Sequence, residues 1–293
     1  INNYEIIDEL GRGTHGKVKL GRNLATNEYV AIKIVERYSK KRRLGKLGNA
    51  EDKVKKEVAI LKKARHPNIV ALLEVIDDPA RKKVYIVLEP QNLDADLHPD
   101  LQYVPCMSVN AARVAFRDTV LGLQYLHYQG IIHRDIKPPN LLQTADHRTK
   151  ISDFGVSYLG RPINDDQVPE NLSESDMQDF DEAKELAKTV GTAAFYAPEL
   201  CYTDGGGETP PVGPAIDVWA LGITLFCMLF GRTPFVDNEY VVMRRIADEE
   251  IYLAYEELDD LLLDLFRRLL QKDPTKRITL EEVRHHPWVI QDI

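Results

Sequence analysis

The chain has 293 residues, a net charge of −8, 44% hydrophobic residues and 29% charged residues. These values are ordinary for a folded globular protein and exclude a wholly disordered or fibrous chain. No apolar stretch reaches the roughly 20 residues of a membrane-spanning helix, and the negative charge disfavours binding to nucleic acid. We therefore expect neither a membrane nor a nucleic acid among the partners.

Three cysteines, Cys106, Cys201 and Cys227, stand far apart in the sequence. Their spacing fits neither a disulfide framework nor a structural zinc site. A reducing, cytoplasmic setting is the simplest interpretation. The first residue is not Met, so we expect a piece of a longer chain. Charge is uneven, since residues 1–65 hold 17 Lys and Arg against 8 Asp and Glu.

The first part of the chain is predicted to be rich in β-structure. Val54, Val58 and Leu61 recur at helical spacing, which predicts a helix over about residues 51–65 that Pro67 ends. Short alternating runs bounded by turn residues predict strands around it. These strands are expected at residues 4–10, 17–22, 29–35, 70–76 and 83–88.

Helices are predicted to dominate the rest. Ser108 can cap a long helix that runs to about Gln129. Residues 218–230 are apolar on all sides, as a helix at the centre of a domain is. Thr279 and Glu282 have the spacing of a capping box that begins a last helix. A small β-rich part followed by a larger helical part is therefore expected.

A glycine-rich loop lies between the first two predicted strands. Gly11, Gly13, Gly16 and Val18 form a complete GxGxxGxV pattern. Glycines let a backbone close over phosphates and present N–H groups to them. The pattern alone is weak evidence for phosphate binding, and an ordinary hairpin is the alternative. A strand follows the last glycine where a dinucleotide-binding fold needs a helix, which disfavours NAD.

Lys33 lies inside an apolar strand, in the sequence Val-Ala-Ile-Lys. An unpaired buried ammonium is costly, so Lys33 needs a counter-ion unless it lies at an edge. Glu57 lies on the inner stripe of the 51–65 helix and is the natural candidate. A Lys33–Glu57 pair would fix the ammonium against the phosphates of a nucleotide.

Three further motifs follow in order. They are the His-Arg-Asp-Ile-Lys-Pro-Pro-Asn sequence at residues 133–140, Asp153-Phe-Gly155 and Ala197-Pro-Glu199. Together with the glycine loop and Lys33, they resemble the eukaryotic protein kinase family over essentially the whole chain. The resemblance implies an α+β fold with two lobes. A small antiparallel sheet with one helix would form residues 1–89, a hinge residues 90–96 and a mainly helical lobe residues 97–293.

The resemblance also implies a role for each matching residue, with ATP and Mg²⁺ as cofactors. Asp135 would orient the substrate hydroxyl and accept its proton. Lys137 would stabilise the transferred phosphoryl group, and its position is typical of serine/threonine kinases. Asn140 and Asp153 would hold Mg²⁺, and Lys33 would hold the α- and β-phosphates.

Apolar side chains would sandwich the adenine base, with Leu88 as gatekeeper and Glu89 at the start of the hinge. The nucleotide-binding residues implied are Leu10, Gly11, Gly13, Gly16, Val18, Ala31, Lys33, Glu57, Leu88, Glu89 and Leu142. Supporting contacts are implied as well. Thr192 should help to hold Asp135 and Lys137, Asp217 should anchor the 133–140 loop, and Glu199 should pair with Arg277.

Closer resemblance points to one branch of the family. Residues 73–79, 123–129, 151–157 and 189–195 are similar to calcium/calmodulin-dependent protein kinase kinases and to the fungal upstream kinases of the AMP-activated kinase homologue. This implies the activation-loop Thr of downstream serine/threonine kinases as substrate. It also implies calmodulin as a partner, through a segment that follows this point in such relatives. The insert at residues 36–50 is basic but lacks proline, and Ala193 replaces a usual proline.

Two alternatives remain open. One is another calmodulin-dependent-kinase-like serine/threonine kinase, and the other is a pseudokinase that acts as a nucleotide-dependent scaffold. Lys33, Glu57, Asp135, Asn140 and Asp153 are all intact, which favours an active enzyme over a scaffold. Pro139 stands where kinases that select basic peptides commonly have Glu. We therefore expect a folded kinase to be preferred over short Arg-rich peptides.

Activation is predicted not to need phosphate at the usual position. Kinases with the His-Arg-Asp sequence commonly use the arginine equivalent to Arg134 to bind a phosphate on the activation loop. The phosphorylated residue usually stands four positions before the equivalent of Thr192. Here that position is Lys188, which cannot be phosphorylated in this way. Residues 164–185 hold nine acidic residues against Lys184. A carboxylate from this stretch could replace the phosphate; a solvated insert is the alternative.

Overall fold

The computed structural model describes residues 1–13, 16–37, 50–78, 82–90, 107–160, 184–202, 212–253 and 258–292. The chain forms two compact units. The first consists of Ile1–Asp96 and Leu142–Val156, and the second of Leu97–Leu141 and Ser157–Ile293. Most of the basic insert, the hinge beyond residue 90 and most of the acidic stretch lie outside the described residues.

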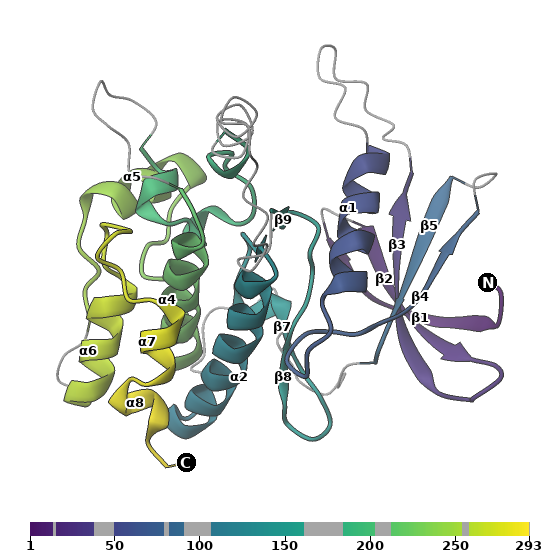
Figure 1. The fold of residues 1–293 in the computed structure, drawn as a ribbon, viewed down its shortest axis with the longest axis horizontal. Coiled ribbons are helices and arrows are strands. Elements are labelled where there is room, and N and C mark those ends of the chain that lie inside the picture. Colours follow the sequence, from purple (N-terminus) through teal and green to yellow (C-terminus); the bar gives the residue numbers. More distant parts are fainter. Residues whose placement is uncertain are drawn as a thin grey trace, which may run out of the picture. The chain divides into compact units, whose positions relative to one another are not determined.

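The first unit is built on a five-stranded antiparallel sheet (Figure 1). All five predicted strands are present, and their order in the sheet is β1-β2-β3-β5-β4. Their bounds are β1 Tyr4–Gly13, β2 Gly16–Asn23, β3 Tyr29–Glu36, β4 Leu72–Asp77 and β5 Lys83–Leu88. The fourth strand begins two residues later than predicted. The reason is that Val70 N donates to the Ile151 carbonyl (3.0 Å), so the chain there pairs with residue 151.

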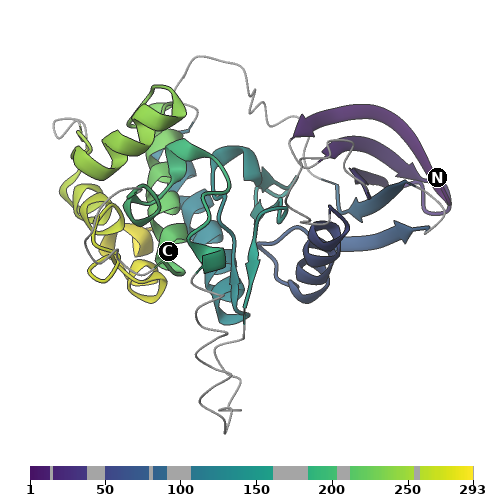
Figure 2. The same cartoon turned by 90° about the horizontal axis from the view of Figure 1, so that it is seen from above.

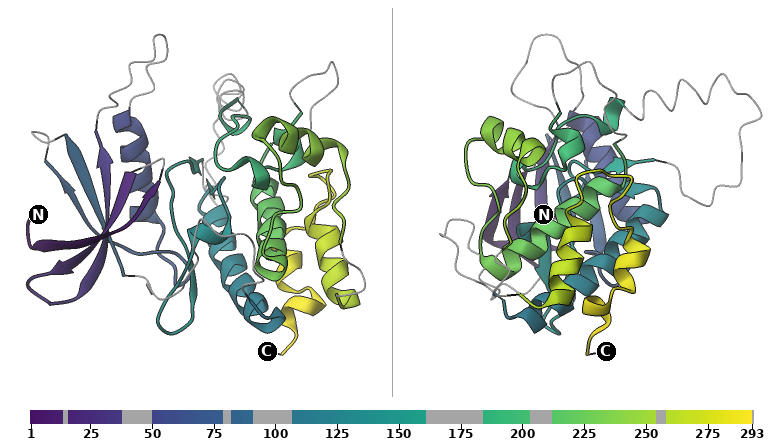
Figure 3. Two further views of the ribbon diagram at one scale, coloured as in Figure 1. Left: turned by 180° about the vertical axis from the view of Figure 1, so that it is seen from behind. Right: turned by 90° about the vertical axis from the view of Figure 1, so that its left-hand side faces the viewer.

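The predicted helix of this unit is α1, Ala50–Lys63. Figures 1 and 3 show it lying against one face of the sheet. Its first turn is acidic and its last turn is basic, which complements the helix dipole at both ends. Ile60 of the helix is fully buried, as is Ile86 of the sheet, which is paired with Lys33. Ile32 belongs to an apolar cluster with Tyr4, Val30 and Val87.

A short hairpin returns the chain to the first unit. Its strands are β7 Leu141–Gln143 and β8 Thr149–Ile151. Asn68 Nδ2 donates to the Thr149 carbonyl (3.0 Å), and Lys150 pairs with Glu89 at 2.7 Å. These contacts place Asp153, which follows the hairpin, in the same compact unit as Lys33.

The second unit is mainly helical (Figure 2). Ser108 Oγ accepts from Ala111 N (3.2 Å), which confirms the predicted cap of the long helix. The apolar helix is almost wholly buried as predicted, but it begins at Ala215 rather than Val218. The helices are α2 Val109–Tyr128, α4 Ala215–Phe230, α5 Glu239–Asp248, α6 Asp260–Leu269, α7 Leu280–Arg284 and α8 Pro287–Ile290.

Shorter elements lie between these helices. They are β6 Ile131–Ile132, β9 Tyr158–Leu159 and the 3₁₀ helices η1 Pro138–Asn140, η2 Ala193–Phe195 and η3 Pro198–Leu200. The strands β6 and β9 pair antiparallel. The predicted capping box of Thr279 and Glu282 is present at the start of α7. Among the described residues, no helix has the length and apolar character needed to cross a bilayer.

Candidate active site

Lys33 is held between two carboxylates in the first unit. Its Nζ lies 2.5 Å from Glu57 Oε1 and 2.9 Å from Asp153 Oδ1. The pair with Glu57 was predicted, whereas the contact with Asp153 spans 120 residues and has no local sequence signal. Burial by itself lowers the pKa of Lys33, but the charges of Glu57 and Asp153 outweigh it and raise that pKa above its usual value. The ammonium therefore stays charged.

Asp153 adopts an unusual backbone conformation. Its φ is +60°, a region that non-glycine residues occupy rarely and that carries strain. The N–H of Gly155 donates to Asp153 Oδ1 (3.3 Å), and the Phe154 side chain is buried. The Asp-Phe-Gly turn thus directs the Asp153 carboxylate toward Lys33 while Phe154 packs into the unit.

The glycine loop contains two kinds of glycine. Gly16 has φ +140°, and a Cβ there would lie 2.4 Å from the Ile34 carbonyl oxygen, so the sheet itself requires glycine. A Cβ on Gly11 would meet none of the described residues within 4 Å. Because these residues leave the space open, Gly11 fits a close approach of phosphate to the backbone.

Most of the apolar residues predicted around the base lie on neighbouring strands of the five-stranded sheet, and Leu142 lies on the separate β7–β8 hairpin. Val18 on β2 is paired with Gly11 on β1 and with Lys33 on β3. Ala31 on β3 is paired with Leu88 on β5. Leu10 belongs to β1 and Leu142 to β7. The register thus puts Val18 directly beside both the glycine loop and the lysine.

Glu89 makes contacts that its predicted place in the hinge did not indicate. Its Oε1 accepts from Ala71 N (2.7 Å) and lies 2.7 Å from Lys150 Nζ. Its own N–H donates to the Ala71 carbonyl (3.1 Å). The side chain therefore fastens the end of β5 to the start of β4 and to β8.

Residues 133–140 of the second unit form a loop, here called the catalytic loop after its predicted role. Asn140 Nδ2 donates to the Asp135 carbonyl (2.7 Å) and to Asp135 Oδ2 (3.0 Å). Thr192 Oγ1 donates to Asp135 Oδ1 (2.9 Å) and accepts from Lys137 Nζ (2.6 Å), which is itself 2.8 Å from Asp135 Oδ2. Both oxygens of the Asp135 carboxylate are thereby oriented.

Asp217 of α4 anchors this loop, as predicted. Its carboxylate accepts from the backbone N–H groups of His133 (2.8 Å) and Arg134 (2.9 Å). His127 Nε2 lies 2.8 Å from the same carboxylate, a partner that the sequence did not reveal. Burial opposes ionisation of Asp217, but His127 and the backbone donors outweigh it and hold the pKa below its usual value.

The Arg134 guanidinium contacts Glu185, the last residue of the acidic stretch. Nη1 donates to the Glu185 carbonyl (2.9 Å), and Nη2 lies 3.4 Å from Glu185 Oε1. Lys188 pairs with the other oxygen of the same carboxylate. Burial lowers the pKa of Arg134, while Glu185 partly offsets that shift. Arg134 also has φ +68°, a second strained residue in the predicted site.

Arg277 and Glu199 form the predicted pair in the second unit. The two guanidinium nitrogens lie 2.7 and 2.8 Å from the two carboxylate oxygens, and neither side chain is exposed. Arg277 also donates to the Ala215 carbonyl (2.8 Å) and lies over the Trp219 ring, 5.4 Å from its centroid. The pair therefore ties η3 to the start of α4.

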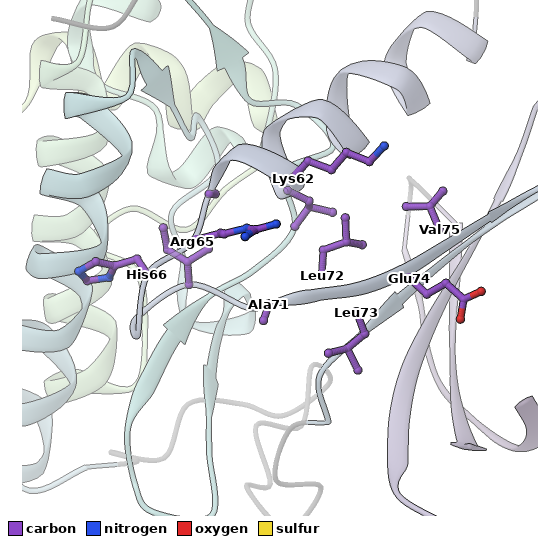
Figure 4. A pocket seen from close by; sticks show the side chains of 11 residues that line it. Lys62, Arg65, His66, Ala71, Leu72, Leu73, Glu74 and Val75 are labelled. Atoms are coloured by element: carbon purple, nitrogen blue, oxygen red, sulfur yellow. The ribbon is translucent and has the colours of Figure 1, made fainter. Parts of the chain in front are cut away.

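A separate groove of about 510 Å³ opens in the first unit between the end of α1 and β4 (Figure 4). Lys62 and Arg65 lie at the helix end, and Leu72 and Val75 lie on the strand. None of the predicted nucleotide-binding residues lines this groove. It is therefore not the predicted nucleotide site.

The residues present fit the implied cofactors by their chemistry. Asp153 and Asn140 offer oxygen atoms, the ligands that Mg²⁺ prefers. The Asn140 side-chain nitrogen donates to Asp135, and its carbonyl oxygen is by its chemistry the atom that could bind a cation. Lys33, fixed by Glu57 and Asp153, would offer a positive charge to phosphates. Within the described ranges, no group of three or more His, Cys, Asp or Glu residues is placed to hold a metal ion.

Comparison with known proteins agrees with the resemblance to protein kinases. The sequence profile of the protein kinase domain matches residues 4–289. The chain belongs to the protein kinase family, among its serine/threonine kinases.

Three curated kinases are similar to this chain over nearly its whole length. The chain is 50% identical to serine/threonine-protein kinase ssp1 of Schizosaccharomyces pombe, with all of this chain and 43% of that protein aligned. It is 40% identical to SNF1-activating kinase 1 of Saccharomyces cerevisiae, over the whole chain and 28% of that protein. Identity to GRIK2 of Arabidopsis thaliana is 39%, over 99% of this chain and 66% of that kinase. The chain thus spans less than half of the first two relatives.

Proposed function

We propose that this kinase transfers the γ-phosphate of ATP to the activation-loop threonine of a downstream protein kinase. The observation that carries the proposal is the orientation of Asp135 by Asn140, Lys137 and Thr192. A carboxylate held at both oxygens is suited to orient a hydroxyl group and accept its proton. Such preorganised positioning is the main contribution that a protein makes to phosphoryl transfer.

The transfer conserves atoms and charge. The substrate hydroxyl oxygen forms a bond to the γ-phosphorus, its proton passes to the Asp135 carboxylate, and the bond from the γ-phosphorus to the bridging oxygen of ADP breaks. Lys137 places a positive charge beside Asp135 and stabilises negative charge on the transferred phosphoryl group. The Thr192 hydroxyl keeps Lys137 and Asp135 together through both of its hydrogen bonds.

The first unit contributes the nucleotide-holding groups. Lys33 would bind the α- and β-phosphates, since Glu57 and Asp153 keep it charged and fix its position. Gly11 would let the backbone approach the phosphates. Asp153 and Asn140 would hold Mg²⁺, which when bound neutralises charge on the β- and γ-phosphates. These intact groups favour catalysis over the pseudokinase alternative.

The substrate class rests on similarity and on one residue of the catalytic loop. The name of SNF1-activating kinase 1 says that it is a kinase that activates SNF1, and it aligns over the whole of this chain. Pro139 lies in η1 and offers no charge to substrate arginine. A folded kinase that presents its loop is therefore preferred over an Arg-rich peptide. We also propose a cytoplasmic location and, from the resemblance to calmodulin-dependent kinase kinases, calmodulin as a partner of the whole protein.

Phosphosite mapping tests this function. The kinase is incubated with ATP, Mg²⁺ and a catalytically inactive SNF1-type kinase domain, and phosphorylated positions are identified by mass spectrometry. We expect phosphate on the activation-loop threonine and none when that threonine is alanine. The Asp135→Asn variant serves as the inactive control. Comparable kcat/KM for a short Arg-rich peptide, or phosphate placed only elsewhere, would overturn the substrate class.

A further inference from the structure

Arg134 is a buried cation beside the predicted catalytic carboxylate. Only 5% of its side chain is exposed, and a guanidinium remains charged at any pH at which proteins fold. A buried charge without an anionic partner is strongly destabilising. Asp217 binds the Arg134 backbone N–H. The charges of Glu185 and, less strongly, Asp217 favour the charged guanidinium.

Glu185 supplies the larger part of this stabilisation. Its carbonyl and its carboxylate both contact the guanidinium, at 2.9 and 3.4 Å. Its second carboxylate oxygen pairs with Lys188. The carboxylate thus lies between two cations, which removes the like-charge conflict between Arg134 and Lys188. The arrangement has the charge pattern of a loop phosphate bound by basic residues, with a carboxylate as the anion.

The segment of residues 185–192 is fastened to the catalytic loop at both ends. Glu185 binds Arg134 at one end, and Thr192 binds Asp135 at the other. Near the second end Gly191 approaches so closely that a Cβ would lie 2.5 Å from the Arg134 carbonyl oxygen. Release of Glu185 would leave Leu186 in the apolar core but remove the polar contact at this end, and so loosen the segment that positions Thr192 and, through it, Asp135.

We propose that Glu185 is a positioning residue that takes the place of a phosphate on Arg134 and holds the catalytic loop in its active arrangement without phosphorylation of the segment. The inference rests on the proposed role of Asp135. Phosphorylation orders the corresponding segment of many kinases through new contacts to arginine. In this chain the anion is the carboxylate of Glu185, so activity does not depend on phosphorylation of the segment.

The first test uses the unaltered protein. The kinase is expressed in bacteria and treated with phosphatase, the absence of phosphate is verified by mass spectrometry, and kcat is measured on the folded kinase substrate. We expect kcat to be retained. Activity that vanishes on dephosphorylation and returns when phosphate is restored would overturn the inference while leaving the kinase function intact. No activity in either form would instead refute the function proposed above.

The second test removes the carboxylate. Glu185→Gln should lower kcat about tenfold or more, because hydrogen bonds to charged groups contribute that much, with a much smaller change in KM for ATP. Glu249→Gln is the matched control, since Glu249 forms an Arg–Glu pair with Arg245 at 3.1 Å on the surface of α5. We expect that control to leave kcat unchanged. An unchanged kcat in Glu185→Gln would overturn the inference.

A rescue experiment tests whether Glu185 positions the catalytic loop or only supports the fold. Adding Lys188→Glu to Glu185→Gln returns a carboxylate three positions further along the segment, at the predicted phosphate position. Recovery of kcat supports a requirement for an anion on Arg134. Arg134→Gln combined with Glu185→Gln should cost no more than Arg134→Gln alone, since both remove one interaction. Fully additive losses would show that Glu185 acts through another group and would overturn the proposal.

Discussion

Two arginine–glutamate pairs in the same unit differ in almost every physical respect. Arg277 and Glu199 are joined by two short hydrogen bonds and are wholly buried. Arg134 and Glu185 have one longer side-chain contact, and 31% of the Glu185 side chain is exposed. Glu185 is also shared with Lys188, whose side chain is mostly exposed. The first pair has the geometry of a permanent brace, and the second has that of a contact that can be released.

This difference indicates that one pair stabilises the fold and the other positions the residues of the site. A buried pair whose charges are both removed from water becomes very costly when one partner is lost. The Glu185 pair should cost less to break, because the Glu185 side chain is partly exposed and its backbone carbonyl still accepts from the Arg134 guanidinium in a Gln variant. We therefore expect the Glu199 pair to govern stability and the Glu185 pair to govern the arrangement of Asp135.

The largest expected effect is on stability, from Glu199→Gln. The variant leaves Arg277 buried without its counter-charge, so the free energy of unfolding should fall by about 3–5 kcal/mol. Urea denaturation at constant pH measures this. Asp248→Asn is the control, because Asp248 belongs to an exposed pair with Arg244 and should leave the denaturation midpoint unchanged. An unaltered midpoint for Glu199→Gln would show that this pair does not brace the unit.

The largest expected effect on catalysis comes from Asp135→Asn. The amide cannot accept the substrate proton, so kcat should fall on the order of 10²-fold or more, the size of general-base and orientation effects. Thermal unfolding and ATP binding should be nearly unchanged. Steady-state kinetics with the folded kinase substrate provides the measurement. Full activity in this variant would remove Asp135 from the mechanism.

Gly191→Ala sharpens the comparison by disturbing the segment from its other end. Gly191 has φ +101°, and an added Cβ would press on the Arg134 carbonyl at 2.5 Å. Because the obstacle is backbone of the catalytic loop, kcat should fall roughly tenfold, with some loss of stability from the strained φ. Gly213→Ala is the control, since a Cβ there meets no described residue within 4 Å. Equal kcat in both variants would contradict the close approach.

The glycine loop of the first unit also contains one residue expected to affect stability and one expected to affect ligand binding, with smaller effects. Gly16→Ala should lower stability by about 1–3 kcal/mol, the usual cost of a side chain in a strained conformation, because its Cβ would collide with Ile34. Gly11→Ala should leave stability unchanged and raise KM for ATP a few fold, since the space it fills is needed only by the phosphates. Fluorescence titration with ATP and thermal melts distinguish the two. A Gly11→Ala variant that binds ATP normally would exclude Gly11 from phosphate binding.

Much of the architecture could be predicted because its signals are local. Alternation predicted the five long strands, and capping residues predicted the starts of α2 and α7. Strands β6 to β9 could not be found, since two or three residues show no periodicity. The central helix was placed late because its first turn contains Asp217, a polar residue that interrupts an apolar run. That residue is polar because it anchors the catalytic loop.

The site was predictable as a set of motifs but not as a set of contacts. Lys33 and Glu57 could be paired because a buried cation on a strand needs an acid on the facing helix. The approach of Asp153 to Lys33 depends on the return of β8 to the first unit, which no spacing reveals. Nine acids precede Lys188, and the sequence could not say which of them reaches Arg134.

The most direct test compares Glu199→Gln and Glu185→Gln in one dephosphorylated preparation of each. Both the free energy of unfolding and kcat per folded molecule are measured. We expect Glu199→Gln to lose stability with kcat per folded molecule kept, and Glu185→Gln to lose kcat with most of its stability kept. Losses of stability and activity in the same proportion for both variants would contradict the division of roles between the two pairs.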